Sequence, residues 1–130
     1  MELLLDKETV KRVQNIILKF DPNLSIQVLD NTAKTAKDAA KSLNCEVGAI
    51  VKSLLLKVEE SFLICLVAGD KRCSLNKLKK ILNKKNICMA SADEVKKKTG
   101  FSIGGVSPVG HINKLDILID KSLNRFKYIF

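Results

Sequence analysis

A single lysine inside an apolar run is the residue of this sequence best suited to chemistry. Lys52 lies in the segment GAIVKSLLL, whose other residues predict a buried β-strand. An ammonium group in such a strand either reaches solvent at the strand end or is held in a pocket. In a pocket it would meet an anion or a polarised carbonyl group. The sequence leaves both interpretations open.

The segment TGFSIGGVSPVGH, residues 99–111, is a second candidate because it is rich in glycine yet nearly uncharged. Connecting loops are usually polar, so an apolar loop with several glycines and Pro108 indicates backbone brought close to another group. It is either a rigid set of backbone N–H and C=O groups around a small pocket or a tight turn between a helix and a strand. His111, the only histidine, either orients a ligand or is a hydrogen-bonded structural residue. Gly69, in VAGDKR, belongs either to a site or to a plain turn.

Other kinds of catalytic or metal site have no matching pattern. The sequence contains no GxSxG or Walker motif, no Cys/His pair by spacing, and no pair of acids placed by a recognisable motif. The cysteines are scattered without a CxxC spacing, and we expect all of them to be reduced: Cys45, Cys65, Cys73 and Cys88. With one histidine and no paired cysteines, the sequence predicts no metal and no cofactor.

The positive charge is concentrated in the second half of the chain. The net charge is +9, and residues 66–130 hold 14 of the 23 basic side chains but only five of the 14 acidic ones. Clusters occur at Lys71 and Arg72, between Lys77 and Lys85, and at Lys96, Lys97 and Lys98. Such a surface attracts a polyanion such as nucleic acid, but lysine-rich helices are also ordinary solvated faces. Because aromatic residues are few, charge alone does not decide between the two.

Periodicity and capping patterns predict the elements that must position these residues. Helices are expected at 6–20, 35–44, 74–86 and 91–100, with N-caps at Asp6, Thr35, Ser74 and Ser91. Strands are expected at 24–30, 49–58, 62–69, 87–90, 114–120 and 125–130, the second and third forming a central hairpin. No linker or repeat divides the chain. We therefore expect one mixed α/β domain over residues 1–130, with about six strands and four helices.

The amino-terminal stretch MELLLDKETV indicates a cytoplasmic protein. It has three leucines before an aspartate, no basic lead and no small-residue cleavage site, so it predicts neither a signal peptide nor a membrane span. The composition, 46% hydrophobic and 28% charged residues, is typical of a globular domain. We expect no membrane partner.

Four segments, in order, resemble the YbaK/ProX family of bacterial-type aminoacyl-tRNA editing domains. They are TAKDAAKSLNCEVGAIVKSLLLK, LVAGDKRCSLNKLKKIL, ADEVKKKTGFSIGGVSPVGH and LDILIDKSLNRF, within residues 32–126. The resemblance implies a single-domain fold with a mixed, barrel-like central sheet and surrounding helices. It also implies an aminoacyl-tRNA deacylase, a hydrolase that cleaves the ester between a wrong amino acid and the 3′ end of a tRNA, usually tRNA for proline.

The resemblance also implies roles for individual residues. Lys52 matches the family's functional lysine and is the expected catalytic residue. Substrate binding is expected from the five residues that match the family's Gly-x-x-x-Pro loop and from two further glycines and the histidine: Gly104, Gly105, Val106, Ser107, Pro108, Gly110, His111 and Gly69. The expected tRNA-binding residues are Lys71, Arg72, Lys96, Lys97 and Lys98. The expected partners are tRNA and prolyl-tRNA synthetase.

The end of the sequence departs from the family pattern. Family members continue beyond Phe130 by some tens of residues that supply part of the pocket, so a C-terminally short domain with impaired hydrolysis is expected. In RFKYIF, Phe126, Tyr128 and Phe130 lie on one side of a predicted edge strand, which favours a homo-oligomer or a recruited partner, whereas Lys127 favours a monomer. Two other functions remain open: a tRNA-binding module without catalysis, and a regulatory or interaction protein with a vestigial pocket. The amino acid removed is not specified by the sequence.

Overall fold

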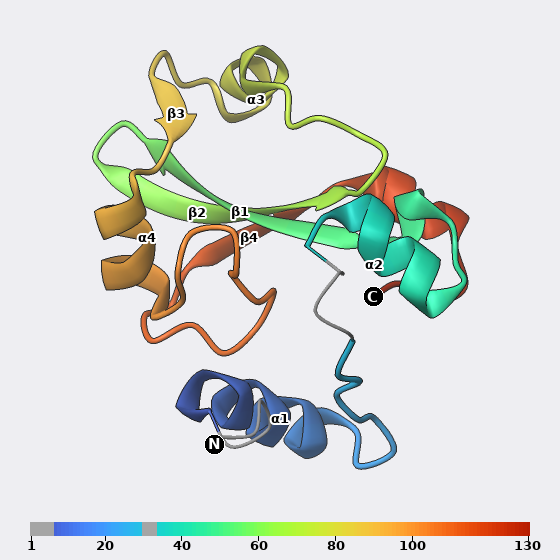
Figure 1. Ribbon diagram of the computed structural model, residues 1–130. Coiled ribbons are helices and arrows are strands. Elements are labelled where there is room, and N and C mark those ends of the chain that lie inside the picture. The colour runs from blue at the N-terminus through green and yellow to red at the C-terminus, as the bar shows by residue number, and fades with distance from the viewer. Residues whose placement is uncertain (1–6, 30–33) are drawn as a thin grey trace.

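The computed structural model describes residues 7–29 and 34–130 (Figure 1). Along these residues the elements are α1 (Glu8–Phe20), α2 (Ala36–Leu43), η2 (Val47–Ala49), β1 (Val51–Val58), β2 (Ser61–Ala68), α3 (Leu75–Leu82), β3 (Ile87–Met89), α4 (Ala92–Thr99), β4 (Asp116–Ile119) and η3 (Lys121–Arg125). The helices of this part of the chain are all too short or too polar to cross a membrane.

The strands form one mixed four-stranded sheet in the order β3-β1-β2-β4. β1 and β2 are the predicted central hairpin and pair antiparallel along their whole length, with Glu59 at φ 54° in the turn. β4 pairs parallel to β2, and β3 pairs antiparallel to residues 56–58 of β1. The sheet is not closed into a barrel, and β3 leaves the first half of the β1 edge uncovered.

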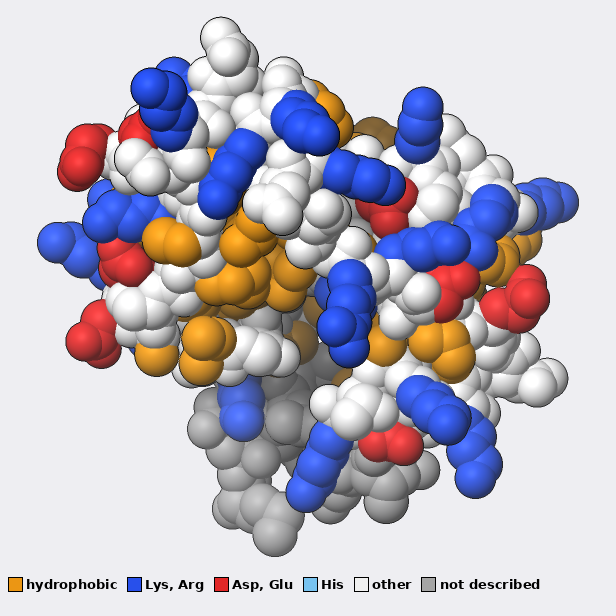
Figure 2. All heavy atoms as spheres, turned by 90° about the horizontal axis from the view of Figure 1, so that it is seen from above, with side chains coloured by type: hydrophobic (Ala, Val, Ile, Leu, Met, Phe, Trp, Pro, Cys, Tyr) orange, Lys and Arg blue, Asp and Glu red, His pale blue; other side chains and the backbone are white. Residues whose placement is uncertain are grey.

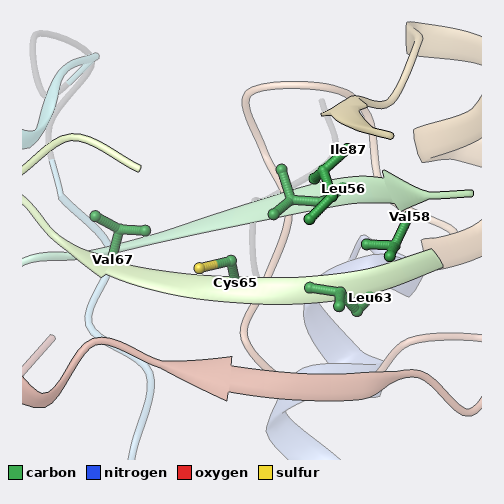
Figure 3. Packing of buried hydrophobic residues seen from close by; sticks show 6 residues of the cluster. All are labelled: Leu56, Val58, Leu63, Cys65, Val67 and Ile87. Atoms are coloured by element: carbon green, nitrogen blue, oxygen red, sulfur yellow. The ribbon is translucent and has the colours of Figure 1, made fainter. Parts of the chain in front are cut away.

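Alternating side chains of the hairpin fill two separate cores. One cluster packs against Leu75, Leu78 and Leu82 of α3. Its buried members, shown in Figure 3, are Leu56, Val58, Leu63, Cys65, Val67 and Ile87. The other, on the opposite side, contains Leu55, Ile64, Ala90 and Val95. α3 therefore covers one face of the sheet, while α4 and the loop that follows it lie on the other, with α1 beyond that loop (Figure 1). We call this loop, residues 100–112, the glycine loop.

Local capping signals in the sequence are confirmed where the structure describes them. Each predicted N-cap side chain accepts a hydrogen bond from the backbone N–H three residues further on: Thr35, Ser74 and Ser91. Ser91 and Glu94 form the predicted capping box, and Gly100 ends α4 at φ 81°, a conformation that favours glycine. Asp6, the fourth predicted N-cap, lies outside the described residues.

Two predicted strands are wrong, so the sheet has four strands in the described residues instead of six. Residues 24–29 form no strand; Leu24 and Val28 are about half exposed, so their alternation corresponds to no buried face. Residues 125–130 form no strand either: Arg125 is the last residue of η3, and residues 126–130 are irregular. Only Phe130 pairs with the sheet region, through backbone hydrogen bonds to Ala49 and Val51.

Candidate functional site

A cavity of about 390 Å³ lies beside the uncovered edge of β1. Its walls come from the start of α2, the end of β3, α4 and the glycine loop, which are distant in sequence but meet at this edge. Most of the lining consists of small and medium-sized apolar side chains: Ala36, Ala39, Ile50, Ala90, Val95, Ile103 and Val106. This space, which we call the first cavity, is of a size that suits a small ligand.

Lys52 occupies the second position of β1, and its half-buried side chain lines the first cavity. Its Nζ donates a hydrogen bond to the backbone oxygen of Lys71, 2.6 Å away. An ammonium group has three N–H donors, and the described residues occupy one of them, which leaves two for a ligand. The lysine singled out in the sequence is therefore held at a cavity wall by a fixed backbone acceptor.

Ser53 brings further polar groups to the same edge. In an antiparallel ladder, alternate residues direct their backbone N–H and C=O groups to the same side. On β1 this side is marked by Val51 and Leu55, whose backbone atoms bond to Phe130 and Ala90. Ser53 lies between them and before the part of β1 that β3 covers. Its backbone N–H and C=O groups therefore point to the uncovered edge of β1. Its Oγ is buried and has no hydrogen-bond partner among the described residues.

The glycine loop contributes Gly104 and Val106 to the wall of the first cavity. Gly104 has φ 81°, which glycine adopts without strain, and a hydrogen bond of 2.8 Å from the Gly105 N–H to the Ser102 oxygen closes the turn there. Three predicted substrate-binding residues lie in the same loop but outside the described wall: Gly105, Ser107 and Pro108.

Gly110 and His111 brace the glycine loop. The Nε2 atom of His111 lies 2.7 Å from the Ser107 oxygen, and its ring stands edge-on to that of Phe101. Arg12 of α1 donates a hydrogen bond of 2.6 Å from Nε to the Gly110 oxygen, and its guanidinium carbon lies 4.7 Å from the centre of the Phe101 ring. α1 thus fixes the far end of the loop whose beginning lines the first cavity.

Gly69 lies just after β2 and outside the described wall of the first cavity. A Cβ there would collide with the backbone oxygen of Val47, so close packing against η2 requires glycine. The neighbouring Asp70 accepts two hydrogen bonds from Arg125, at 2.9 and 2.8 Å. These bonds lower the pKa of the Asp70 carboxyl and join the end of β2 to η3.

The predicted tRNA-binding residues form two groups, each connected to the first cavity. Lys71 and Arg72 are exposed in the segment between β2 and α3, and the Lys71 oxygen holds Lys52. The run 96–98 forms the last turn of α4, directly after Val95 of the cavity wall. Nucleic acid bound to either group would lie close to the cavity.

The charged side chains in the wall of the first cavity are both cationic, Lys34 and Lys52. The wall formed by the described residues includes no Asp, Glu or His. Within residues 7–29 and 34–130 there is also no group of three or more His, Cys, Asp or Glu side chains that could hold a metal ion. This site can attract an anion and polarise a carbonyl group, but the side chains of its described wall supply no general base.

Sequence reasoning missed Arg12, Lys34 and Ser53. Ser53 follows Lys52 directly in an apolar strand, and this second polar residue was a signal that could have identified it. Arg12 and Lys34 lie in segments with other basic residues, and nothing in the local pattern separates them from solvated side chains.

Comparison with known sequences gives matches along nearly the whole chain. It is 30% identical over 126 residues to a proline–tRNA ligase of Fervidobacterium nodosum, covering 97% of this chain and 20% of the ligase. It is 28% identical over 123 residues to the uncharacterized protein YwhH of Bacillus subtilis, covering 94% of this chain and 78% of that protein. The chain thus spans about a fifth of the length of the ligase relatives.

Comparison with solved structures also finds a protein related to prolyl tRNA synthetase. The crystal structure of a proposed trans-editing enzyme for prolyl tRNA synthetase superposes with a TM-score of 0.86 at 35% identity, covering 92% of this chain and 76% of that one. The family model described as the aminoacyl-tRNA editing domain matches residues 30–130, which include β1 with Lys52 and the whole glycine loop. The chain belongs to the aminoacyl-tRNA editing domain family.

Proposed function

We propose that this protein hydrolyses the ester that joins a wrong amino acid to the 3′ end of a tRNA, with tRNA for proline as substrate and the cytoplasm as its place of action. The observation that carries the proposal is the first cavity, a small apolar space with Lys52 and Ser53 at an uncovered strand edge. Similarity to proline–tRNA ligases and to a proposed trans-editing enzyme for prolyl tRNA synthetase supports the choice of tRNA.

The proposed reaction needs little covalent chemistry from the protein because an aminoacyl ester is already reactive. Water attacks the carbonyl carbon, the bond from that carbon to the ribose oxygen breaks, and the ribose oxygen takes up a proton. The free donors of Lys52 would stabilise the charge that develops on the carbonyl oxygen or would hold the terminal phosphate. The backbone N–H of Ser53, on the uncovered edge, would supply a second donor.

Activation of the water would fall to the substrate. No side chain in the described wall of the first cavity is a carboxylate or an imidazole. In the substrate, the neutral α-amino group of the amino acid could accept the proton from the water, and the ribose hydroxyl next to the ester could relay it. The protein's contribution is then orientation and electrostatic stabilisation, and the apolar wall selects amino acids by size.

The lysine run of α4 is proposed to contact tRNA phosphates. Replacing Lys96, Lys97 and Lys98 with glutamine should weaken tRNA binding and flatten its salt dependence, because each lost phosphate contact lowers the slope of log affinity against log salt by roughly 0.7–0.9. Filter binding at several salt concentrations measures this slope. The matched control is the same change at three exposed lysines of the α1 region: Lys7, Lys11 and Lys19. An equal slope for the α4 variant and the native protein would mean that the run is a solvated face.

We also propose that the C-terminal residues mediate self-association. The side chains of Tyr128, Ile129 and Phe130 are 68%, 48% and 48% exposed, and adjacent exposed apolar groups favour a protein contact. Light scattering at micromolar concentration should show an oligomer for the native protein and a monomer for Phe130→Asp. Phe20→Asp, at a position of α1 that is 84% exposed, is the matched control. Monomers in all three samples would contradict the proposal.

The test of the proposed function is deacylation of a panel of misacylated tRNAs by the purified protein. Release of a small, wrong amino acid from tRNA for proline, with correctly charged tRNA left intact, is the expected result. Salt-dependent tRNA binding without release of any amino acid would instead identify a binding module. Absence of both would leave a regulatory or interaction protein.

A further inference from the structure

We propose that a second cavity, on the α3 side of the sheet, binds the terminal nucleotide of the tRNA; this inference rests on the function proposed above. The cavity has a volume of about 730 Å³ and lies between α3 and the face formed by β2 and β4. Leu78 and Ile81 of α3 line one side, and Val67 and Leu118 of the sheet line the other. Space of this size and apolar character suits a planar base.

The rim of the second cavity is strongly basic. Four cationic side chains line it: Lys71, Arg72, Lys77 and Lys121. The acidic residue of the lining is Asp120, whose carboxylate accepts hydrogen bonds from the backbone N–H groups of Ala68 at 3.2 Å and Ser122 at 2.9 Å. Figure 2, which looks onto the α3 side, shows apolar side chains gathered at the surface with Lys and Arg side chains around them. A ligand that complements this cavity has an apolar part that fits between α3 and the sheet and an anionic group that meets the basic rim.

The floor of the second cavity is uncharged as well as apolar. Cys65 and Cys73 both line it, and both belong to or pack against the buried cluster on this face. Burial, together with the neighbouring thiol of Cys73, raises the pKa of Cys65 to about 12. The buried thiol is therefore protonated at neutral pH and adds no negative charge to the floor of the cavity.

A hydrogen bond joins the two cavities. Lys52 lines the first cavity, Lys71 lines the second, and the Lys52 Nζ donates to the Lys71 oxygen at 2.6 Å. In an aminoacyl-tRNA, the ester separates the amino acid from the ribose and base of the last nucleotide. With the amino acid in the first cavity and the ester at Lys52, the nucleotide extends toward Lys71. The described lining of the second cavity contains no aromatic ring, so the guanidinium plane of Arg72 would be the group that stacks on the base.

Adenosine 5′-monophosphate tests the inference because it contains the base and a phosphate but no ester. We expect it to shift the amide NMR signals of residues 71–74, 78 and 118–122 of the full chain saturably, and to leave residues 103–106 of the first cavity unchanged. Arg72→Ala and Ile81→Ser should each weaken this binding about tenfold, because the first removes the stacking guanidinium and the second removes apolar contact with the base. Ile81 is 73% exposed, so its replacement spares the core. Lys84→Ala, a change of charge outside both cavities, should leave the affinity unchanged.

Several results would overturn the inference. These are no saturable shifts, shifts confined to residues 103–106, equal shifts with inorganic phosphate alone, or tighter binding of an acidic leucine-containing peptide at the same residues. The test of the nucleotide site can fail or succeed independently of the test of the proposed hydrolase. Nucleotide binding without deacylation would contradict only the hydrolase, whereas deacylation with equal kcat/KM for the native protein and Ile81→Ser would contradict only the nucleotide site.

Discussion

Replacing Lys52 with alanine is expected to slow ester hydrolysis by about 100-fold or more, because a preorganised donor to a developing oxyanion is worth roughly 10²–10³ in rate. The fold should persist, since the side chain is half-buried and its hydrogen bond in the structure goes to a loop oxygen, that of Lys71. Single-turnover rates on a misacylated tRNA measure the first expectation, and thermal unfolding followed by circular dichroism measures the second.

Two further variants separate the role of Lys52 from a general effect of charge. Lys57→Ala removes a lysine from the same strand, five positions along, where it pairs with Glu94 at 3.6 Å and lies outside the first cavity. Its rate should equal that of the native protein. Lys52→Arg keeps the charge but changes the geometry of the donors, and we expect partial activity. A native rate for a folded Lys52→Ala protein would remove Lys52 from the mechanism.

Replacing Ile103 with alanine is expected to change which amino acids are removed. Ile103 lines the first cavity and is 58% exposed, so shortening it enlarges the cavity without opening a hole in the core. Discrimination by an apolar pocket is worth about 1–3 kcal/mol per methylene. The rate for tRNA charged with valine, relative to tRNA charged with alanine, should therefore rise about tenfold or more.

Single-turnover rates on the two charged tRNAs give this ratio directly. Ile112→Ala is the matched control, because Ile112 belongs to the same loop, is 55% exposed and lies outside the described cavity wall. Its ratio should stay at the native value. If Ile103→Ala and Ile112→Ala give the same ratio, Ile103 does not form part of the amino-acid pocket.

Local signals predicted most of the fold. The hairpin of β1 and β2 follows from two apolar runs around an acidic turn, and the helix starts at Thr35, Ser74 and Ser91 follow from side chains that bond to nearby backbone. The failures depend on distant partners. Residues 24–29 alternate like a strand, but no strand of the described residues pairs with them, and none of their side chains belongs to the buried core. A strand needs a partner, and its pattern does not say whether the fold supplies one.

The candidate site was predictable to a similar degree. Lys52 and the glycine loop stood out because their residue types conflict with their surroundings, a lone charge in an apolar strand and glycines in an apolar connection. The structure brings Lys52, Gly104 and Val106 into one wall. The contribution of Arg12 could not be predicted, because its contact with Gly110 spans 98 residues and depends on how α1 packs.

The measurement that tests the account most directly is the single-turnover hydrolysis of mischarged proline tRNA by the native protein and by Lys52→Ala, side by side. We predict release of the amino acid by the native protein well above the spontaneous rate, and release by the variant lower by about 100-fold or more. Equal rates for the two folded proteins, or a native rate no faster than spontaneous hydrolysis, would contradict the proposed role of the first cavity.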